Sequence, residues 1–100
     1  MLYGGTDLVG RALQGKLEAA LGNSIIIDNR ASAGGVLGVA LVAKSAPDGY
    51  TLLLSSASFT FTPSLYKDLP YDAIRDFKPI TNVAQTPLIL CVHPSLPVLS

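Results

Sequence analysis

The sequence has no tryptophan, a single cysteine and a single histidine, and only 14% of its residues are charged. Seven basic and seven acidic residues cancel, so we expect no basic surface of the kind that binds nucleic acid or anionic membranes. Cys91 lacks a partner for an internal disulfide and lies in an apolar run, which favours a buried, inert thiol. His93 has no cysteine or carboxylate at ligand spacing and precedes Pro94, which favours a structural role. The sequence therefore predicts no metal site, no cofactor and no catalytic residue.

The sequence also lacks long apolar runs. No apolar run approaches the roughly 20 residues of a membrane span. The chain does not begin with the basic segment, apolar segment and cleavage site of a signal peptide, so we expect no export signal. Apolar residues are nevertheless abundant, at 49% with a mean hydropathy of +0.44. A chain of 100 residues is one domain at most, and its apolar content predicts that part of its surface contacts a partner.

Helical and extended patterns alternate along the chain. An apolar stripe predicts a helix over 6–21 that Gly22-Asn23 ends, and the β-branched run of 24–28 predicts a strand buried on both faces. Such alternation predicts an α/β fold, with a mostly parallel sheet and helices on both faces. A second helix is expected over 36–45, with Val36, Ala40 and Ala43 on one face. The further expected elements are a buried strand over 50–54, a short helix from Thr62-Pro63 to Tyr66, and strands over 79–85 and 88–92.

The run Gly4-Gly5-Thr6-Asp7 opens the first expected helix. The glycines leave backbone N–H groups uncovered, Thr6 offers a hydroxyl N-cap, and Asp7 falls in the first turn. N–H groups at the positive end of a helix dipole attract a carboxylate or phosphate. The same sequence also suits a tight turn that begins a helix and binds nothing, and the local residues leave both interpretations open.

A second candidate loop, Ser55-Ser56-Ala57-Ser58, follows the expected strand 50–54. Strand-to-helix loops of a parallel sheet share one edge, so we expect this loop on the same side as the glycine loop. Its hydroxyl groups suit the wall of a polar pocket, and they suit turns and helix caps equally well.

Several motifs in order resemble a known family. They are Gly-Gly-Thr-Asp-Leu-Val before the first helix, Asp28-Asn29-Arg30 with Ala33-Gly34-Gly35, Ala46-Pro47-Asp48-Gly49-Tyr50, Leu69-Pro70-Tyr71-Asp72 and Val92-His93-Pro94-Ser95. Together they closely resemble the receptors of tripartite tricarboxylate transporters, the TctC-like or Bug-type periplasmic solute-binding proteins. The order and spacing of the motifs, along nearly the whole chain, carry the resemblance.

The resemblance implies one lobe of a type II periplasmic-binding-protein, or Venus-flytrap, fold. Such a protein captures a small organic carboxylate, for example a di- or tricarboxylate, between two lobes and delivers it to membrane transporter subunits. It would be periplasmic, without catalysis and without a cofactor. The family's carboxylate-binding positions correspond here to Gly4, Gly5, Thr6 and Asp7, with a second wall at Ser55, Ser56, Ala57 and Ser58.

The chain also departs from the family pattern. Where the family has a signal peptide and a first strand, only Met1-Leu2-Tyr3 precede the glycine loop, and the second lobe has no counterpart. We therefore expect residues 1–100 to form a single partial domain, the first lobe without its first strand. The sequence does not specify which acid is bound.

The residues leave two alternatives to a carboxylate receptor open. A truncated remnant that binds nothing would pair its exposed sheet edges with a second copy, giving a homodimer or a larger assembly. A phosphate- or nucleotide-binding α/β unit also uses a glycine loop, but neither Gly-x-Gly-x-x-Gly nor a Walker lysine is present.

Overall fold

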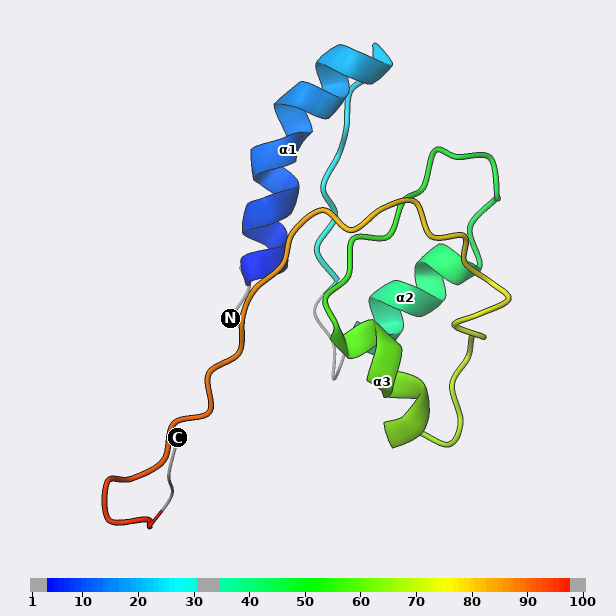
Figure 1. The fold of residues 1–100 in the computed structure, drawn as a ribbon. Helices are drawn as coiled ribbons and strands as arrows, with labels where there is room; N and C mark the ends of the chain where they lie inside the picture. The colour runs from blue at the N-terminus through cyan, green and yellow to red at the C-terminus, as the bar shows by residue number, and fades with distance from the viewer. Residues whose placement is uncertain (1–3, 31–34, 98–100) are drawn as a thin grey trace.

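The computed structural model describes residues 4–30 and 35–97, which form three helices (Figure 1). The helices are α1 (Gly5–Leu21), α2 (Val36–Ala43) and α3 (Ser58–Leu65). Extended and irregular segments join them, and within the two described ranges no residue is in a β-strand.

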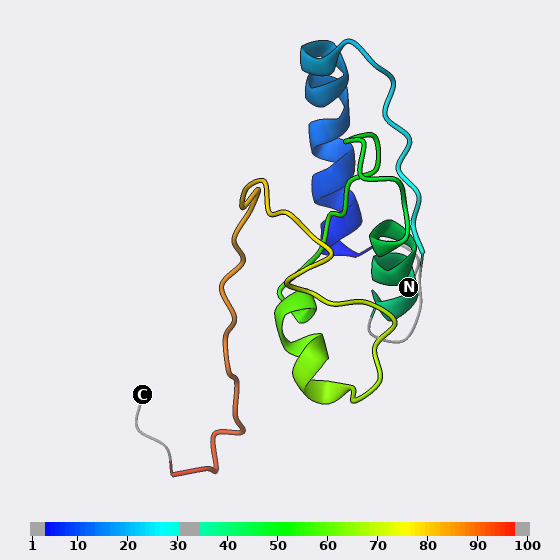
Figure 2. The same ribbon diagram turned by 90° about the vertical axis from the view of Figure 1, so that its right-hand side faces the viewer.

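Helix α1 confirms the prediction made from the apolar stripe. It ends as expected at Gly22, which takes the left-handed conformation with φ 70° and donates its N–H to the carbonyl of Glu18 at 2.9 Å. Glycine adopts this conformation without the steric cost that a Cβ atom brings. The chain then reverses and runs back along the helix (Figures 1 and 2).

Side chains of α1 bind the main chain of this returning segment. Gln14 Nε2 donates to the carbonyl oxygen of Ile25 at 2.7 Å, and the N–H of Ile25 donates to Glu18 Oε1 at 2.8 Å. Both main-chain polar groups of one extended residue are therefore satisfied by a helix rather than by a neighbouring strand.

A small core joins α2, α3 and the connection after α3. Val39, Ala40 and Tyr71 are its buried apolar members. Around them, Phe77 packs edge to face against two rings, with centroids 5.2 Å from Phe59 and 6.0 Å from Tyr71. The face predicted for α2 is the face that packs here, since Val36, Ala40 and Ala43 all belong to this cluster.

Helix α3 begins earlier than the sequence indicated. Pro63 was expected at the first helical position but lies inside the helix, which starts at Ser58. Thr62 Oγ1 donates to the carbonyl of Ser58 at 2.7 Å, and Thr60 Oγ1 to that of Ala57 at 2.7 Å. These are bonds from a threonine hydroxyl to a carbonyl three or four residues earlier, which threonine commonly forms within helices.

The predicted parallel sheet is wrong for the described part of the chain. The segments expected as strands, at 24–28, 50–54, 79–85 and 88–92, are not strands. Ile25 and Ile27 are half-buried, but Ile26 is 89% exposed, so this segment is covered on one face only. A strand is defined by backbone hydrogen bonds to a neighbouring strand, and apolar, β-branched composition alone does not supply that neighbour.

The resulting molecule is open. Its accessible surface is 8797 Å², whereas a compact folded protein of this mass exposes about 5,400 Å². Its radius of gyration is 16.7 Å, against about 13 Å for a compact domain of this length. Residues 78–97 are all exposed and form an arm that leads away from the helices (Figures 1 and 2). None of the helices in the described ranges is long and apolar enough to span a membrane.

Candidate functional site

The glycine loop leads into α1 without a side-chain cap. Gly4 is the N-cap residue, with extended backbone (φ −101°, ψ 179°), and the first helical bond runs from Leu8 N to Gly4 O at 3.2 Å. The expectation that Thr6 is the N-cap is therefore wrong, because Thr6 lies within the first turn. N–H groups of a first helical turn have no partner inside the helix. Those of Gly5, Thr6 and Asp7 are the donors that this loop offers.

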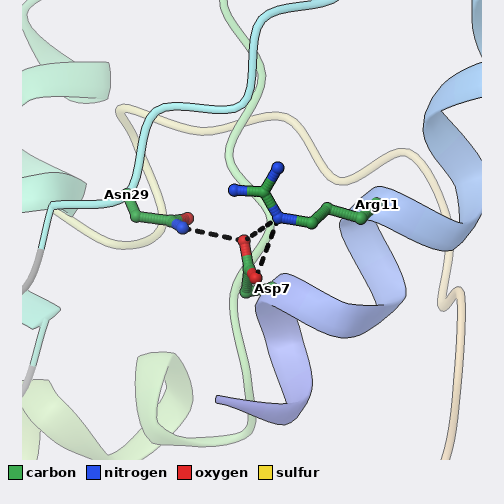
Figure 3. A network of polar contacts seen from close by, with 3 residues as sticks. All are labelled: Asp7, Arg11 and Asn29. Atoms are coloured by element: carbon green, nitrogen blue, oxygen red, sulfur yellow. Dashed lines mark hydrogen bonds and ion pairs between the residues drawn. The ribbon is translucent and has the colours of Figure 1, made fainter. Parts of the chain in front are cut away.

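Asp7 lies in the first turn, as predicted, and its carboxylate joins two parts of the chain (Figure 3). Arg11 Nε donates to both carboxylate oxygens, at 3.1 and 3.0 Å, from one turn further along α1. Asn29 Nδ2 donates to Oδ1 at 2.7 Å from the extended segment that returns along the helix. The Asp7 side chain is only 9% exposed, so these contacts largely enclose it.

The surroundings of Asp7 favour its charged form. The amide of Asn29 lowers the pKa of this carboxyl below its usual value, partial burial opposes the shift, and Arg11 adds to the lowering. A carboxylate that accepts hydrogen bonds in its ionised form keeps its proton less readily. Asp7 therefore stays ionised, with its charge balanced by a neighbouring guanidinium.

The serine loop forms the approach to α3. Ser56 Oγ and Ser58 Oγ share a hydrogen bond of 2.8 Å, and Ser55 Oγ donates to the carbonyl of Ser56 at 3.3 Å. Ala57 is the N-cap residue and carries no side chain that could cap the helix. The hydroxyl groups thus take part in local turn bonds, which is one of the two roles that the sequence left open.

The two candidate loops lie on neighbouring parts of the fold. A Cβ atom built on Gly10 of α1 would lie 3.2 Å from Leu54 Cδ2 and 3.7 Å from Ile27 Cδ1. The residue before the serine loop therefore packs against α1 less than two turns from the glycine loop. In both ribbon views the N-terminal ends of α1 and α3 point into the same region of the molecule (Figures 1 and 2).

Sequence reasoning missed two residues of this region, Arg11 and Asn29. The spacing of Asp7 and Arg11, four residues apart on a helix, is a signal that predicts an ion pair. Asn29 has no comparable local signal, because it lies 22 residues from Asp7 and the two meet only once the chain has reversed at Gly22.

Other chemical features lie outside these loops. A groove of about 590 Å³ runs between α3 and the connection that follows it, and none of the eight predicted ligand-binding residues lines it.

Cys91 is exposed, so the expectation of a buried thiol is wrong; the arm that carries it packs against no core. Across residues 4–30 and 35–97 no group of three or more His, Cys, Asp or Glu is placed to hold a metal ion.

Comparison with known proteins identifies the family. Residues 9–100 match the family described as tripartite tricarboxylate transporter family receptor. The chain belongs to this family, as the motifs indicated. The matched range includes the serine loop and Asn29, whereas Gly4–Asp7 precede it.

Curated relatives agree with this assignment. Protein BugT of Bordetella pertussis is 44% identical over 95 residues, which cover 93% of this chain and 29% of BugT. A UPF0065 protein from the tcbD-tcbE intergenic region of Pseudomonas sp. strain P51 is 36% identical over 89% of this chain and 26% of its own length. A UPF0065 protein of Bordetella bronchiseptica is 39% identical over 86% of this chain and 26% of its own. No solved structure matches the chain.

The chain spans between a quarter and a third of the length of these relatives. The family is one of transporter receptors, which is not a class of enzymes.

Proposed function

We propose that this chain is the ligand-capturing part of a periplasmic receptor that binds a small organic carboxylate, such as a di- or tricarboxylate, for a tripartite transporter. Family membership supports the receptor class. The observation that carries the ligand chemistry is the start of α1 at Gly4, where no side chain caps the helix. The mechanism is reversible binding without covalent chemistry.

The first turn of α1 supplies suitable donors for an anion. The N–H groups of Gly5 and Thr6 lie at the positive end of a helix dipole, where a negative charge is stabilised. Each hydrogen bond from such a group to a charged oxygen contributes about 1.5–3 kcal/mol. Asp7 would repel a carboxylate, but its pairing with Arg11 balances its charge.

The serine loop completes the proposed site from the other side. The second wall would consist of Ser55, Ser56, Ala57 and Ser58, and one of the Ser56 and Ser58 hydroxyl groups would be a further donor, since the other donates within the pair. In this proposal residues 1–100 are the first lobe of a two-lobed receptor, consistent with the 29% of BugT that the chain covers. A half-site open to water would bind its ligand with an affinity in the millimolar range, about −4 kcal/mol.

Amide NMR spectra of the chain, titrated with citrate, test this function. We expect the amides of Gly5, Thr6, Ser56 and Ser58 to shift together, with glycerol as the uncharged control. Shifts with ATP but not with citrate or succinate would favour a nucleotide-binding unit. Citrate shifts confined to other residues would overturn the proposed site.

One substitution deletes a single donor while keeping the helix. Gly5 is the first helical residue, where proline is tolerated, and extended Gly4 before it has the conformation that precedes proline. Gly5→Pro should therefore weaken citrate binding about tenfold, because it removes one charge-assisted hydrogen bond. Gly5→Ala is the matched control, since it retains the N–H and a Cβ there meets no atom within 4 Å.

The exposed arm supports a second candidate, self-association into a homodimer without ligand binding. Leu88 and Leu90 are 96% and 92% exposed, and the chain exposes about 3,400 Å² more than a compact protein of its mass. A stable interface buries about 1,600 Å² in total, so this surplus is sufficient for one. Light scattering should report a dimer that Leu88→Lys with Leu90→Lys dissociates, whereas a wild-type monomer would rule this candidate out.

A further inference from the structure

The contact between Asn29 and Asp7 lies directly beside the proposed anion donors. We propose that Asn29 is a positioning residue of the binding site, which holds the Asp7 carboxylate away from the first-turn N–H groups and so keeps them available to the ligand. The inference rests on the proposed function, because it concerns the same donors.

The position of Asp7 makes this restraint necessary. An acidic side chain in the third position of a helix can reach back to the start of that helix; in a capping box it accepts the N–H of the N-cap residue, which is Gly4 here. A carboxylate there is also stabilised by the helix dipole. Left unrestrained, Asp7 would compete with an external carboxylate for the free N–H groups at the start of α1.

The observed geometry shows the carboxylate held elsewhere. Its described hydrogen bonds go to Asn29 Nδ2 at 2.7 Å and to Arg11 Nε at 3.0 and 3.1 Å (Figure 3). Arg11 is on the same helix as Asp7, so its bond does not tie the carboxylate to another segment of the chain. Asn29 belongs to another segment and fixes where Asp7 lies relative to the rest of the fold.

The charges around this contact come from two elements. Arg11 is the cation from α1, and on the segment that carries Asn29 the flanking residues Asp28 and Arg30 form an ion pair of 2.8 Å. That pair is internally balanced, so the neutral amide of Asn29 is the group on this segment that bonds directly to Asp7.

Four forms of the chain test the inference: wild type, Asn29→Ala, the double variant Asn29→Ala with Asp7→Ala, and Asn23→Ala. Asn23 is the matched control, because the contact described for its amide is with the carbonyl of Leu21, at 3.3 Å, at the far end of α1. Citrate affinity, measured from the amide shifts, should fall about tenfold in Asn29→Ala, because Asp7 then loses the hydrogen bond that holds it and competes for the donors. The double variant should bind citrate more tightly than Asn29→Ala, because the competing carboxylate is gone.

A measurement without ligand separates this inference from the proposed function. In Asn29→Ala the amide resonances of Gly5 and Thr6 should shift as the Asp7 carboxylate moves onto them, and they should return in the double variant. Unchanged amides in Asn29→Ala, or a double variant as weak as the single one, would overturn the positioning role. Absence of citrate binding in every form would instead count against the proposed function, and the ligand-free amides would still decide the role of Asn29.

Discussion

Gly10 of α1 faces Leu54 so closely that a Cβ atom on the glycine would lie 3.2 Å from Leu54 Cδ2. Gly15, one and a half turns further along the same helix, has no such neighbour within 4 Å. A substitution at Gly15 therefore measures helix propensity alone, whereas one at Gly10 measures propensity together with packing against Leu54.

Alanine at these two positions should have different effects. Gly15→Ala should stabilise the chain by about 1 kcal/mol, the usual gain for replacing glycine inside a helix. Gly10→Ala should gain less, because the methyl group must displace the end of the Leu54 side chain. Thermal unfolding followed by circular dichroism measures both, and equal gains would contradict the contact between α1 and Leu54.

The pairing of Asp7 predicts a loss of stability in acid. Its pKa is lowered in the folded chain by Asn29, against partial burial, and further by Arg11, so the folded state favours the ionised form. The contribution is fully present above the unfolded value of about 4 and is lost as the pH falls through the lower folded pKa. Unfolding midpoints measured from pH 6 to about pH 2 should fall less steeply in Asp7→Asn than in wild type. Asp68→Asn, at an exposed carboxylate, is the control.

The hydroxyl of Tyr71 predicts a stabilising substitution. Tyr71 is 8% exposed, and within the described structure its buried hydroxyl has no hydrogen-bond partner. Because an unsatisfied buried polar group costs about 1–3 kcal/mol, Tyr71→Phe should raise the free energy of unfolding by about 1 kcal/mol. Tyr50→Phe, at an exposed ring, should leave it unchanged. A loss of stability in Tyr71→Phe would show that the hydroxyl has a partner.

Asp72 holds the turn that presents Tyr71 and Phe77 to the core. Its Oδ1 accepts the N–H groups of Ile74 at 2.9 Å and Arg75 at 3.0 Å, and the N–H groups of Arg75, then Ile74, lower the pKa of this carboxyl. Asp72→Ala should lower the unfolding midpoint and broaden the near-ultraviolet circular dichroism of the aromatic cluster. Asp72→Asn, which keeps an acceptor oxygen, should retain most of both signals.

Local sequence patterns were sufficient to predict the two helices α1 and α2, whose hydrogen bonds join residues close together in the chain. The apolar stripe and Gly22 placed α1, and Val36, Ala40 and Ala43 placed the packed face of α2. The start of α3 was misplaced, because proline signals a helix start and the hydroxyl bonds of Thr60 and Thr62 were not foreseen.

The same local reasoning predicted a sheet that the described residues do not form. The run Ile25–Ile27 has the composition of a buried strand, yet the main chain of Ile25 bonds to Gln14 and Glu18 of a helix. Composition reports the tendency of a segment to be extended and apolar, whereas a strand also requires a second segment at hydrogen-bonding distance.

The sequence by itself determined the family, through motifs that follow one another in order along the chain, and the helix α1, through an apolar stripe of residues close together in the chain. Only the tertiary structure decided that Asp7 meets Asn29, that Leu54 packs against Gly10, and that the extended segments within 4–30 and 35–97 lack strand partners. These relationships join residues 22 or more positions apart. They depend on how the chain reverses after α1, which no local pattern specifies.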